Sequence, residues 1–435
     1  MQRRVLSFSA LSIGLALIVG ACGGGATTTP AATTAATARP AATAAATSAP
    51  ATPAAAQEII IASDFPTSGA DASSGLPAQN GAAFAVSQTP EYKGIKISFL
   101  PFDDAVNGVH DPQKGAQNAQ QMLSNAKVLA MVGPFNSNVA RAMIPVANQG
   151  ALAMMSPANT NECLTQTFPY CDPQPKALRP TGKNNYFRIA APDTVQGPAM
   201  ADFIVDTLKL TKVAVFSDNE TFGKGVADNF AKRLVAKKGT VTNRQDFDMK
   251  STSDFKAFIN AAKAAGAQAV YAGATSATKA CIVRSQMAGI LDVPFTGPDG
   301  IGDSQCIKDA GANAANMYFT NAAGDAAQNP EAAATIAAFK AKYTKKEDLG
   351  AYTFPAYDCA LILVDAVKRA IDANAGKVPT RQQVVDAVQA TKGLKGTGGT
   401  YAFDANGDPT SATMAFYQTK GTPLDWAFVK QFSVQ

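Results

Sequence analysis

Short apolar runs with strand character alternate with longer amphipathic runs of helical period along most of the chain. In the first half the strand-like runs lie at residues 59–62, 95–102, 128–132 and 152–155, and the helical runs lie at residues 76–87, 112–125 and 139–149. After residues 186–190 the alternation starts again, with strands at 213–216, 270–271 and 294–296 and helices at 223–238 and 276–288. Further helices at 330–343, 357–374 and 380–390 precede a β-rich ending between residues 400 and 432. This pattern predicts an α/β fold with two doubly wound parallel-sheet lobes.

The first 22 residues have the pattern of an export signal. Arg3 and Arg4 precede an apolar run at residues 5–19, and this run of about 15 residues is shorter than the roughly 20 that a spanning helix needs. The sequence Val-Gly-Ala-Cys at residues 19–22 resembles a bacterial lipobox, which predicts a signal peptide at residues 1–21 and a lipid on Cys22. An ordinary cleavage site beside an incidental cysteine is the alternative. The arginine pair leaves the general and the twin-arginine export routes both open.

Residues 22–57 consist almost entirely of Ala, Thr, Pro, Ser and Gly, with Arg39 as the one charge. Such a segment cannot bury an apolar core, so we expect a disordered linker that tethers the folded body to the membrane.

The charge of the mature chain is nearly balanced. Without Arg3 and Arg4, 36 of the 38 basic residues remain against 33 acidic ones, and they form no basic clusters, which argues against nucleic-acid binding. Because His110 is the one histidine of the chain, most metal sites and catalytic triads are excluded. Because it follows a polar turn before a helical run, we expect it to lie in a solvated loop.

The cysteines fit an oxidising exterior. Besides Cys22, the chain has five, and Cys163 and Cys171 flank a loop with Pro169 that favours a disulfide. Cys281 and Cys306 are a second candidate pair, and Cys359 lies in an apolar helical run that predicts a buried free thiol. No Cys-x-x-Cys occurs, so disulfides explain these spacings better than a metal site does.

No catalytic motif stands out in the sequence. A Gly-x-Ser-x-Gly elbow, a phosphate-binding Gly-x-x-x-x-Gly-Lys loop and a metal-spaced His/Asp set are all lacking. Ligands of open α/β sheets lie beyond the carboxyl ends of the strands, so the turns at those ends are the candidate binding elements.

Three such turns have suitable chemistry. After the strand at residues 128–132, Ser137 opens a helix and could hold an anion there, or it could simply be the N-cap. Residues 156–160 place small residues and the Thr160 hydroxyl where a carboxylate could lie, or they form a plain proline turn. Asp299 follows the strand at residues 294–296 and could pair with an ammonium group, although Asp-Gly turns are common.

Together with several short motifs, these turns give the chain a specific resemblance. From about residue 59 to 421 it resembles the leucine/isoleucine/valine-binding family of bacterial solute-binding proteins, which serve branched-chain amino-acid ABC importers. The motifs are Asp103-Asp104, Asp111-Pro112-Gln113, Val132-Gly133 with Ser137, Ser156-Pro157-Ala158-Asn159-Thr160, Phe187-Arg188 with Gln196-Gly197, Phe222-Gly223-Lys224-Gly225, Gly297-Pro298-Asp299-Gly300 and Phe403-Asp404-Ala405-Asn406-Gly407-Asp408.

The resemblance implies a type I periplasmic binding protein, whose two lobes close on the solute about a hinge. It places lobe 1 at residues 58–192 with a return at 323–412, and lobe 2 at residues 193–322 with a return at 413–435. By position, Ser137, Ala158 and Thr160 would bind a solute α-carboxylate and Asp299 would accept the α-ammonium.

The end of the pocket that would take the solute side chain departs from the family pattern. Ser74-Gly75 stands where the family has tyrosine before glycine, Phe222 replaces another tyrosine, and Thr275 falls near a third aromatic position. Phe222 fits a core aromatic equally well. These differences favour another amino acid, or an amide, over leucine.

The sequence thus predicts a monomeric, non-enzymatic lipoprotein receptor without a cofactor, held at the outer face of the cytoplasmic membrane. Its partners would be a small solute, the permease subunits of an ABC importer and the membrane, with no nucleic acid. A sensor acting through a separate signalling partner, a binder of an amide or small carboxylate, and a secreted hydrolase are the alternatives.

Overall fold

The computed structural model describes residues 57–434. The predicted signal peptide, Cys22 and nearly all of the linker lie outside the described residues. Within the described range, no helix combines the length and the apolar character needed to cross a membrane.

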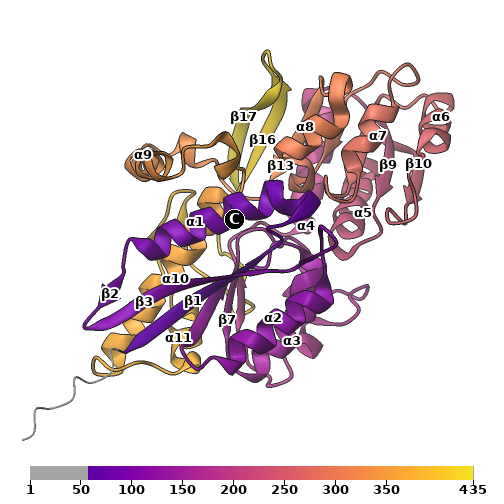
Figure 1. The fold of residues 1–435 in the computed structure, drawn as a ribbon. Coiled ribbons are helices and arrows are strands. Elements are labelled where there is room, and N and C mark those ends of the chain that lie inside the picture. The colour runs from indigo at the N-terminus through magenta and orange to yellow at the C-terminus, as the bar shows by residue number, and fades with distance from the viewer. Residues whose placement is uncertain (1–56, 435) are drawn as a thin grey trace, which may run out of the picture. The chain divides into compact units, whose positions relative to one another are not determined.

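The first sheet follows from apolar runs whose side chains alternate between two faces. Its strand order is β2-β3-β1-β6-β7-β8, and every pairing is parallel except that of the edge strand β2. In β1, Ile59 and Ile61 enter one apolar cluster while Ile60 and Ala62 face another, as the two-residue period of a strand requires. The strands are β1 (Glu58–Phe65), β2 (Glu91–Tyr92), β3 (Ile95–Asp103), β6 (Val128–Val132), β7 (Ala153–Ser156) and β8 (Tyr186–Arg188) (Figure 1).

Helices cover both faces of this sheet. One face carries α1 (Ala72–Ser87), α10 (Thr353–Ala373) and α11 (Arg381–Gln389), and the other carries α2 (Pro112–Ser124) and α3 (Ser137–Gln149). The first sheet with these five helices is called lobe 1 below.

The second sheet has the order β10-β9-β11-β12-β13-β16-β17 and is parallel up to β13 and antiparallel beyond it. Its helices also cover two faces, and sheet and helices together are called lobe 2. The strands are β9 (Lys212–Ser217), β10 (Thr240–Asp246), β11 (Ala269–Gly273), β12 (Phe295–Gly297), β13 (Met317–Asn321), β16 (Ala412–Lys420) and β17 (Asp425–Val434). The helices are α4 (Asp193–Asp202) and α5 (Thr221–Ala236) on one face, and α6 (Lys256–Ala264), α7 (Ala280–Gln286) and α8 (Ser304–Ala310) on the other.

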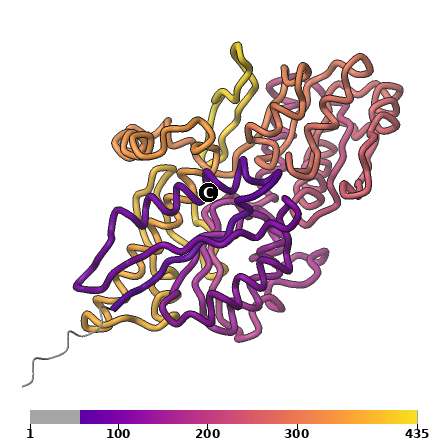
Figure 2. The backbone as a smooth tube through the Cα atoms, viewed as in Figure 1, coloured from indigo at the N-terminus to yellow at the C-terminus, as the bar shows by residue number. Residues whose placement is uncertain are grey.

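The chain passes between the sheets repeatedly, as Figure 2 allows the reader to follow. It leaves the first sheet after β8 and builds β9 to β13. It then returns through α9 (Ala333–Lys342) to α10 and α11, and ends in the second sheet with β16 and β17. Two small hairpins complete the fold, β4 (Ala105–Val106) with β5 (Val109–His110) and β14 (Leu394–Lys395) with β15 (Thr400–Tyr401). The predicted α/β class with two doubly wound sheets is confirmed, whereas the residue bounds assigned to the lobes stay predictions.

Both predicted disulfides are present, Cys163–Cys171 in the loop after β7 and Cys281–Cys306 between α7 and α8. Cys359 is a buried free thiol inside α10.

The prediction for His110 was wrong. Its side chain is only 1% exposed, because the β4–β5 hairpin folds back onto the residues before α1 and the imidazole lies between two carboxylates. The polar composition of the hairpin gave no sign of this burial.

Candidate functional site

The turn after β6 brings Ser137 to the carboxyl edge of the first sheet. Gly133 starts this turn with φ +116°, and a Cβ there would lie 2.3 Å from the carbonyl oxygen of Asp64, so only glycine fits. Ser137 is the first residue of α3 rather than its N-cap, which is Asn136. The Ser137 hydroxyl is buried and accepts a hydrogen bond from the Asn161 N–H at 3.4 Å. The N-cap reading of Ser137 is therefore wrong.

The loop after β7 places Thr160 beside this turn. The Ser156 hydroxyl donates to the Pro134 carbonyl and accepts from the N–H groups of Ala158 and Asn159, which fixes the backbone of the loop. Ala158 and Thr160 are buried, and the Thr160 hydroxyl has no hydrogen-bond partner in the structure. A buried hydroxyl without a partner is costly, so Thr160 is suited to a polar ligand group.

Arg188 holds this loop in place through hydrogen bonds to its backbone. Its Nε donates to Asp408 at 2.7 Å, its Nη1 donates to the carbonyls of Asn159 and Asn161, and its Nη2 donates to Thr165. Arg188 is fully buried, and all of these contacts are made inside the protein. The Thr160 loop is therefore a rigid part of lobe 1.

Asp299 faces lobe 1 from the turn after β12. Its carboxylate accepts hydrogen bonds from Gln196 of α4 and, at 2.8 Å, from the hydroxyl of Tyr352 just before α10. Burial raises the pKa of Asp299 to about 6, against the opposing effect of these two donors. The contact from Tyr352 joins lobe 1 to the acid of lobe 2.

Asp193, the first residue of α4, lies near both Thr160 and Asp299. Its N–H donates to the Thr160 carbonyl at 2.7 Å. Its buried carboxylate oxygens make no hydrogen bond of good geometry in the structure, although the Thr160 side chain is close enough to act toward a lower pKa. Burial raises the pKa of Asp193 well above its ordinary value, and the charges of Glu162 and Asp299 act in the same direction. The carboxyl group of Asp193 is thus a second acidic element near Asp299.

A third acid, Asp303, is the N-cap of α8 and contacts α1 of lobe 1. Its Oδ2 accepts from Ser73 and Ser74 of α1 at 2.9 and 3.1 Å and from Ser276 at 2.5 Å, and its Oδ1 caps α8 by accepting from the Cys306 N–H. Burial raises the pKa of Asp303 also. Within residues 57–434, Asp193, Asp299 and Asp303 form no ion pair with a lysine or arginine.

The remaining predicted residues lie around the same turn. Phe222 is half-buried and Thr275 is buried, and a Cβ added to Gly300 would lie 2.9 Å from the Phe222 ring and 3.1 Å from the Thr275 methyl group. Ser74 is half-buried and contacts Asp303 rather than Asp299. The structure thus brings Phe222, Thr275 and Asp299 together, and it joins Ser74 to this group through an acid that the sequence analysis missed.

His110 makes a separate contact between the lobes. Its Nδ1 lies 2.8 Å from Asp71, before α1, and its Nε2 lies 2.8 Å from Glu220, before α5 in lobe 2. Asn138 of α3 also donates to Glu220. Although burial alone would lower the pKa of His110, Asp71 and Glu220 outweigh it and raise this pKa well above its ordinary value. The imidazolium therefore joins one acid of each lobe.

Comparisons with known proteins agree with this architecture. Residues 58–423 match the family model described as periplasmic binding protein. A Leu/Ile/Val-binding protein homolog of Brucella melitensis is 29% identical over 364 residues, covering 83% of this chain and 91% of the relative. A leucine-, isoleucine-, valine-, threonine- and alanine-binding protein of Pseudomonas aeruginosa is 26% identical, covering 83% of this chain and 90% of the relative.

Solved structures share the fold at lower identity. The leucine-binding protein LivK of Thermotoga maritima superposes with a TM-score of 0.72 at 23% identity, covering 86% of this chain and 99% of its own. A solute-binding protein of R. palustris in complex with benzoate gives a TM-score of 0.69 at 20% identity, covering 86% of this chain and 96% of its own. These likenesses, the matched family model and the two facing lobes establish that the chain belongs to the periplasmic binding protein family, as its sequence predicts.

Proposed function

We propose that this protein binds an amino acid between its two lobes and delivers it to the permease of an ABC importer. The observation that carries the proposal is that Asp299 of lobe 2 is buried without a counter-cation in the described chain, while the buried Thr160 hydroxyl of lobe 1 has no hydrogen-bond partner in the structure. An ammonium group would neutralise the first, and a carboxylate would accept from the second and from Ser137. The names of the Brucella and Pseudomonas relatives support this solute class.

The anchor can be tested by calorimetry with a panel of amino acids. Replacing Asp299 by alanine should lower affinity by roughly 1.5–3 kcal/mol, because a charge-assisted hydrogen bond is lost. Asp309→Ala on α8 is the matched control, since Asp309 is only partly buried and its carboxylate accepts from Gln305 of the same helix. Affinity that survives Asp299→Ala would show that the ammonium is held elsewhere.

The carboxylate side has its own isosteric test. Thr160→Val removes only the hydroxyl that lacks a partner, so the fold should be kept while affinity falls by about 1 kcal/mol. If amino acids lacking a free carboxylate bind Thr160→Val and the parent protein equally, while carboxylate-bearing ones lose affinity, the assignment holds. Equal affinity of all solutes for both proteins contradicts it.

A receptor should leave its solute unchanged. Recovery of the amino acid chemically intact after long incubation is expected, and any turnover product would favour the hydrolase alternative. A signalling partner that binds the protein only with solute present would favour the sensor alternative.

Benzoate binding by the R. palustris relative makes small carboxylates a necessary part of the panel. A carboxylate that binds more tightly than any amino acid, independently of Asp299, would overturn the proposed solute class.

We further propose that lipid on Cys22 holds the receptor near its permease, since tethering raises the effective concentration of the two partners. Cys22→Ser should release the protein from the membrane fraction while solute affinity stays unchanged. Retention of the variant in membranes would show that the lipid is not the anchor.

A further inference from the structure

The His110 imidazole is oriented by lobe 1 and directed toward lobe 2. Asp71 Oδ2 accepts from the His110 backbone N–H at 2.9 Å and lies 2.8 Å from Nδ1 of the ring. The hairpin that carries His110 is itself held where the Ala70 N–H donates to the Gly108 carbonyl at 2.7 Å. These contacts orient the ring without help from lobe 2, and they leave Nε2 as the atom that meets Glu220.

Glu220 of lobe 2 uses its carboxylate for lobe 1. An N-cap side chain normally accepts from its own helix, and Glu220 is the N-cap of α5, yet it makes no capping hydrogen bond. Its Oε2 instead lies 2.8 Å from His110 Nε2 and accepts from the Asn138 side chain of α3 at 3.0 Å. The contact of His110 with Glu220 is called the interlobe pair below. Because its two residues belong to different lobes, it breaks when the lobes part.

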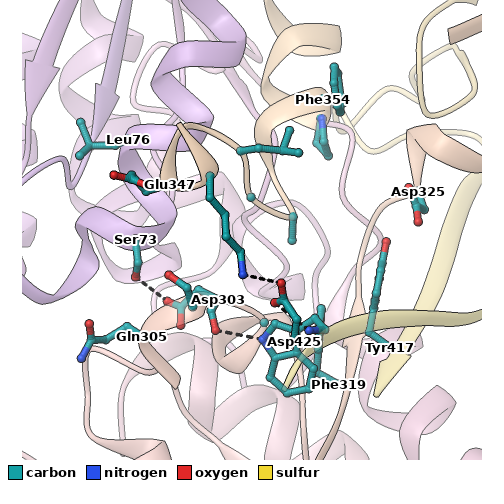
Figure 3. Close-up of a pocket in the computed structure, with 18 of the residues that line it drawn as sticks. Ser73, Leu76, Asp303, Gln305, Phe319, Asp325, Glu347, Phe354, Tyr417 and Asp425 are labelled. Carbon is teal, nitrogen blue, oxygen red and sulfur yellow. Dashed lines mark hydrogen bonds and ion pairs between the residues drawn. The ribbon is translucent and has the colours of Figure 1, made fainter. Parts of the chain in front are cut away.

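Other contacts between the lobes are neutral or exposed. Figure 3 shows the Ser73 hydroxyl of α1 donating to Asp303 at 2.9 Å. The only other ion pair within residues 57–434 that reaches lobe 2 from outside it, Lys346 with Asp425, is exposed on both sides, and such pairs contribute little. The side chains of the interlobe pair are only 1% and 25% exposed, so water screens their attraction less.

Acids of both lobes lie around the His110 ring. Burial alone would lower the pKa of His110, but Asp71 and Glu220 outweigh it and raise this pKa well above its ordinary value. Burial raises the pKa of Asp104, after β3, and of Asp218, after β9, and the charge of His110 opposes this rise in both. The ring is therefore an imidazolium at neutral pH, and the interlobe pair joins opposite charges.

The interlobe pair lies at the start of the helix that reaches the candidate site. Next to Glu220, the Thr221 carbonyl accepts from the Asn161 side chain of lobe 1 at 3.0 Å. Phe222 follows, and its ring lies beside Gly300 in the turn after β12. Fixing Glu220 against lobe 1 therefore fixes the segment that brings Phe222 to the site.

We propose that the interlobe pair holds the two lobes together and positions Phe222, so that it sets how long a bound solute stays. The effect on solute release rests on the proposed function, whereas the effect on the contact between the lobes does not. Because the pair forms only while the lobes touch, it stabilises the closed arrangement and leaves the entry of solute into an open cleft unchanged. His110 and Glu220 are thus positioning residues, which act through closure.

The first test measures the rates of solute binding. Glu220→Gln removes the acid of lobe 2 and leaves the contact of His110 with Asp71 in lobe 1. Stopped-flow experiments use the full-length protein with L-leucine and L-threonine, which carry an apolar and a polar side chain. Dissociation should be roughly 5- to 30-fold faster, the lower part of the usual range for coupled groups, and association should change by less than about twofold.

A double variant and a matched control sharpen this test. Glu220→Gln combined with His110→Gln should release solute no faster than His110→Gln alone, because the two residues act through one contact. The control is Asp228→Asn, since Asp228 also belongs to α5 but its ion pairs with Lys224 and Arg244 stay inside lobe 2. Both of its rates should equal those of the parent protein. Circular dichroism reports whether each variant is folded.

The second test needs no solute. Spin labels at Gln121→Cys on α2 and Lys232→Cys on α5, both exposed positions, report the distance between the lobes by pulsed electron resonance. The Cys22→Ser protein is the background, since its remaining free thiol, Cys359, is buried. Glu220→Gln should shift the distances to longer values, and the control variant should not.

The outcomes of the two tests separate this inference from the proposed function. Longer distances together with faster dissociation at unchanged association support the interlobe pair. Distances equal to those of the parent protein overturn it, and so does a variant whose affinity falls through slower association, because Glu220 would then act on solute entry. If neither L-leucine nor L-threonine binds, the distances alone decide whether the pair holds the lobes, while the calorimetric panel decides the proposed function.

Discussion

Two kinds of buried carboxylate occur in this protein, and their surroundings are opposite in charge compensation. Asp408 is paired with the buried guanidinium of Arg188 at 2.7 Å. Burial acts to raise the pKa of Asp408, but Arg188, with Gln166 and Thr165, outweighs it and lowers this pKa. Within residues 57–434, Asp299 accepts hydrogen bonds from neutral groups only, and burial raises its pKa to about 6. An acid that pairs with a cation inside the protein stabilises the fold, whereas an acid without such a partner can pair with a cation from outside, as we propose for Asp299.

This difference in surroundings agrees with a structural role for Asp408 and with the solute-binding role that we propose for Asp299. Arg188, paired with Asp408, holds the loop that carries Thr160 in place. The two charges neutralise each other within lobe 1. Asp299 and Asp303 lie on lobe 2, face lobe 1, and meet only hydroxyl, amide and backbone donors.

The largest effect is expected from Arg188→Met. It leaves Asp408 buried without its cation and frees the carbonyls of the Thr160 loop, so the free energy of unfolding should fall by about 3–5 kcal/mol. Arg233→Met, which breaks a partly exposed pair with Asp202, should cost less than about 1 kcal/mol. Urea unfolding measures both, and comparable losses would remove the distinction between the two arginines.

Replacement by asparagine should change the free energy of unfolding in opposite directions at the two acids. Asp408→Asn should destabilise the protein, because Arg188 is left uncompensated. Asp299→Asn should leave the solute-free protein equally stable or up to about 3 kcal/mol more stable, since a pKa raised by roughly two units disfavours the folded charged form. Chemical unfolding without solute checks this, and a clear loss of stability in Asp299→Asn would make that carboxylate structural.

His110 offers an intermediate case, a cation that can be switched off. Its imidazolium faces Asp71 and Glu220, with Asp104 and Asp218 nearby. Because its pKa is raised in the folded protein, its stabilisation is complete below pH 6.5, the unfolded value, and is lost as pH rises through the raised pKa. His110→Gln should therefore lower stability by about 1–2 kcal/mol at pH 6 and have little effect at strongly alkaline pH. A difference that stays constant across this range would mean that His110 is neutral in the fold.

The smallest effects are the pH slopes of the two acids. Ionisation of Asp299 should make the solute-free protein less stable between about pH 4 and 6, by at most about 1.4 kcal/mol per pH unit, while solute affinity rises over the same window. Asp408 works in reverse, and its contribution disappears only as pH falls below its ordinary value of 3.8. Differences between the parent protein and each Asp→Asn variant isolate the two slopes. Slopes of equal sign would show that the two acids do not differ as described.

Much of the architecture could be predicted because buried parallel strands read as continuous apolar runs. The strand β6 (Val128–Val132) was predicted with its observed bounds for this reason. The edge strand β10 (Thr240–Asp246) was missed because its sequence is polar, and α4 (Asp193–Asp202) was missed because it contains Gly197 and Pro198. Its hydrophobic pattern carries no clear helical period.

The site was predictable where a single turn carries it and not where distant segments meet. Residues 156–160 and Asp299 follow apolar strands directly, so their place at a sheet edge could be inferred. Tyr352 and Gln196 reach Asp299 from more than 50 residues away. Gln196 belongs to a motif of the family resemblance, but no local pattern shows that either residue contacts Asp299. Asp303 did leave a signal, an aspartate before a short helical run, but an N-cap pattern alone does not reveal its hydroxyl partners.

Arg188 and the Cys163–Cys171 disulfide hold the loop that carries Thr160 from within lobe 1, and the Asp193 N–H of lobe 2 adds one hydrogen bond to the Thr160 carbonyl. The carboxylate half of the site is therefore held mainly by lobe 1. Asp299 belongs to lobe 2, and the hydrogen bond from the Tyr352 hydroxyl joins it to lobe 1. We therefore expect solute to be captured first by the open lobe 1, at a rate set by collision, and to be released at a rate set by how often lobe 2 swings away.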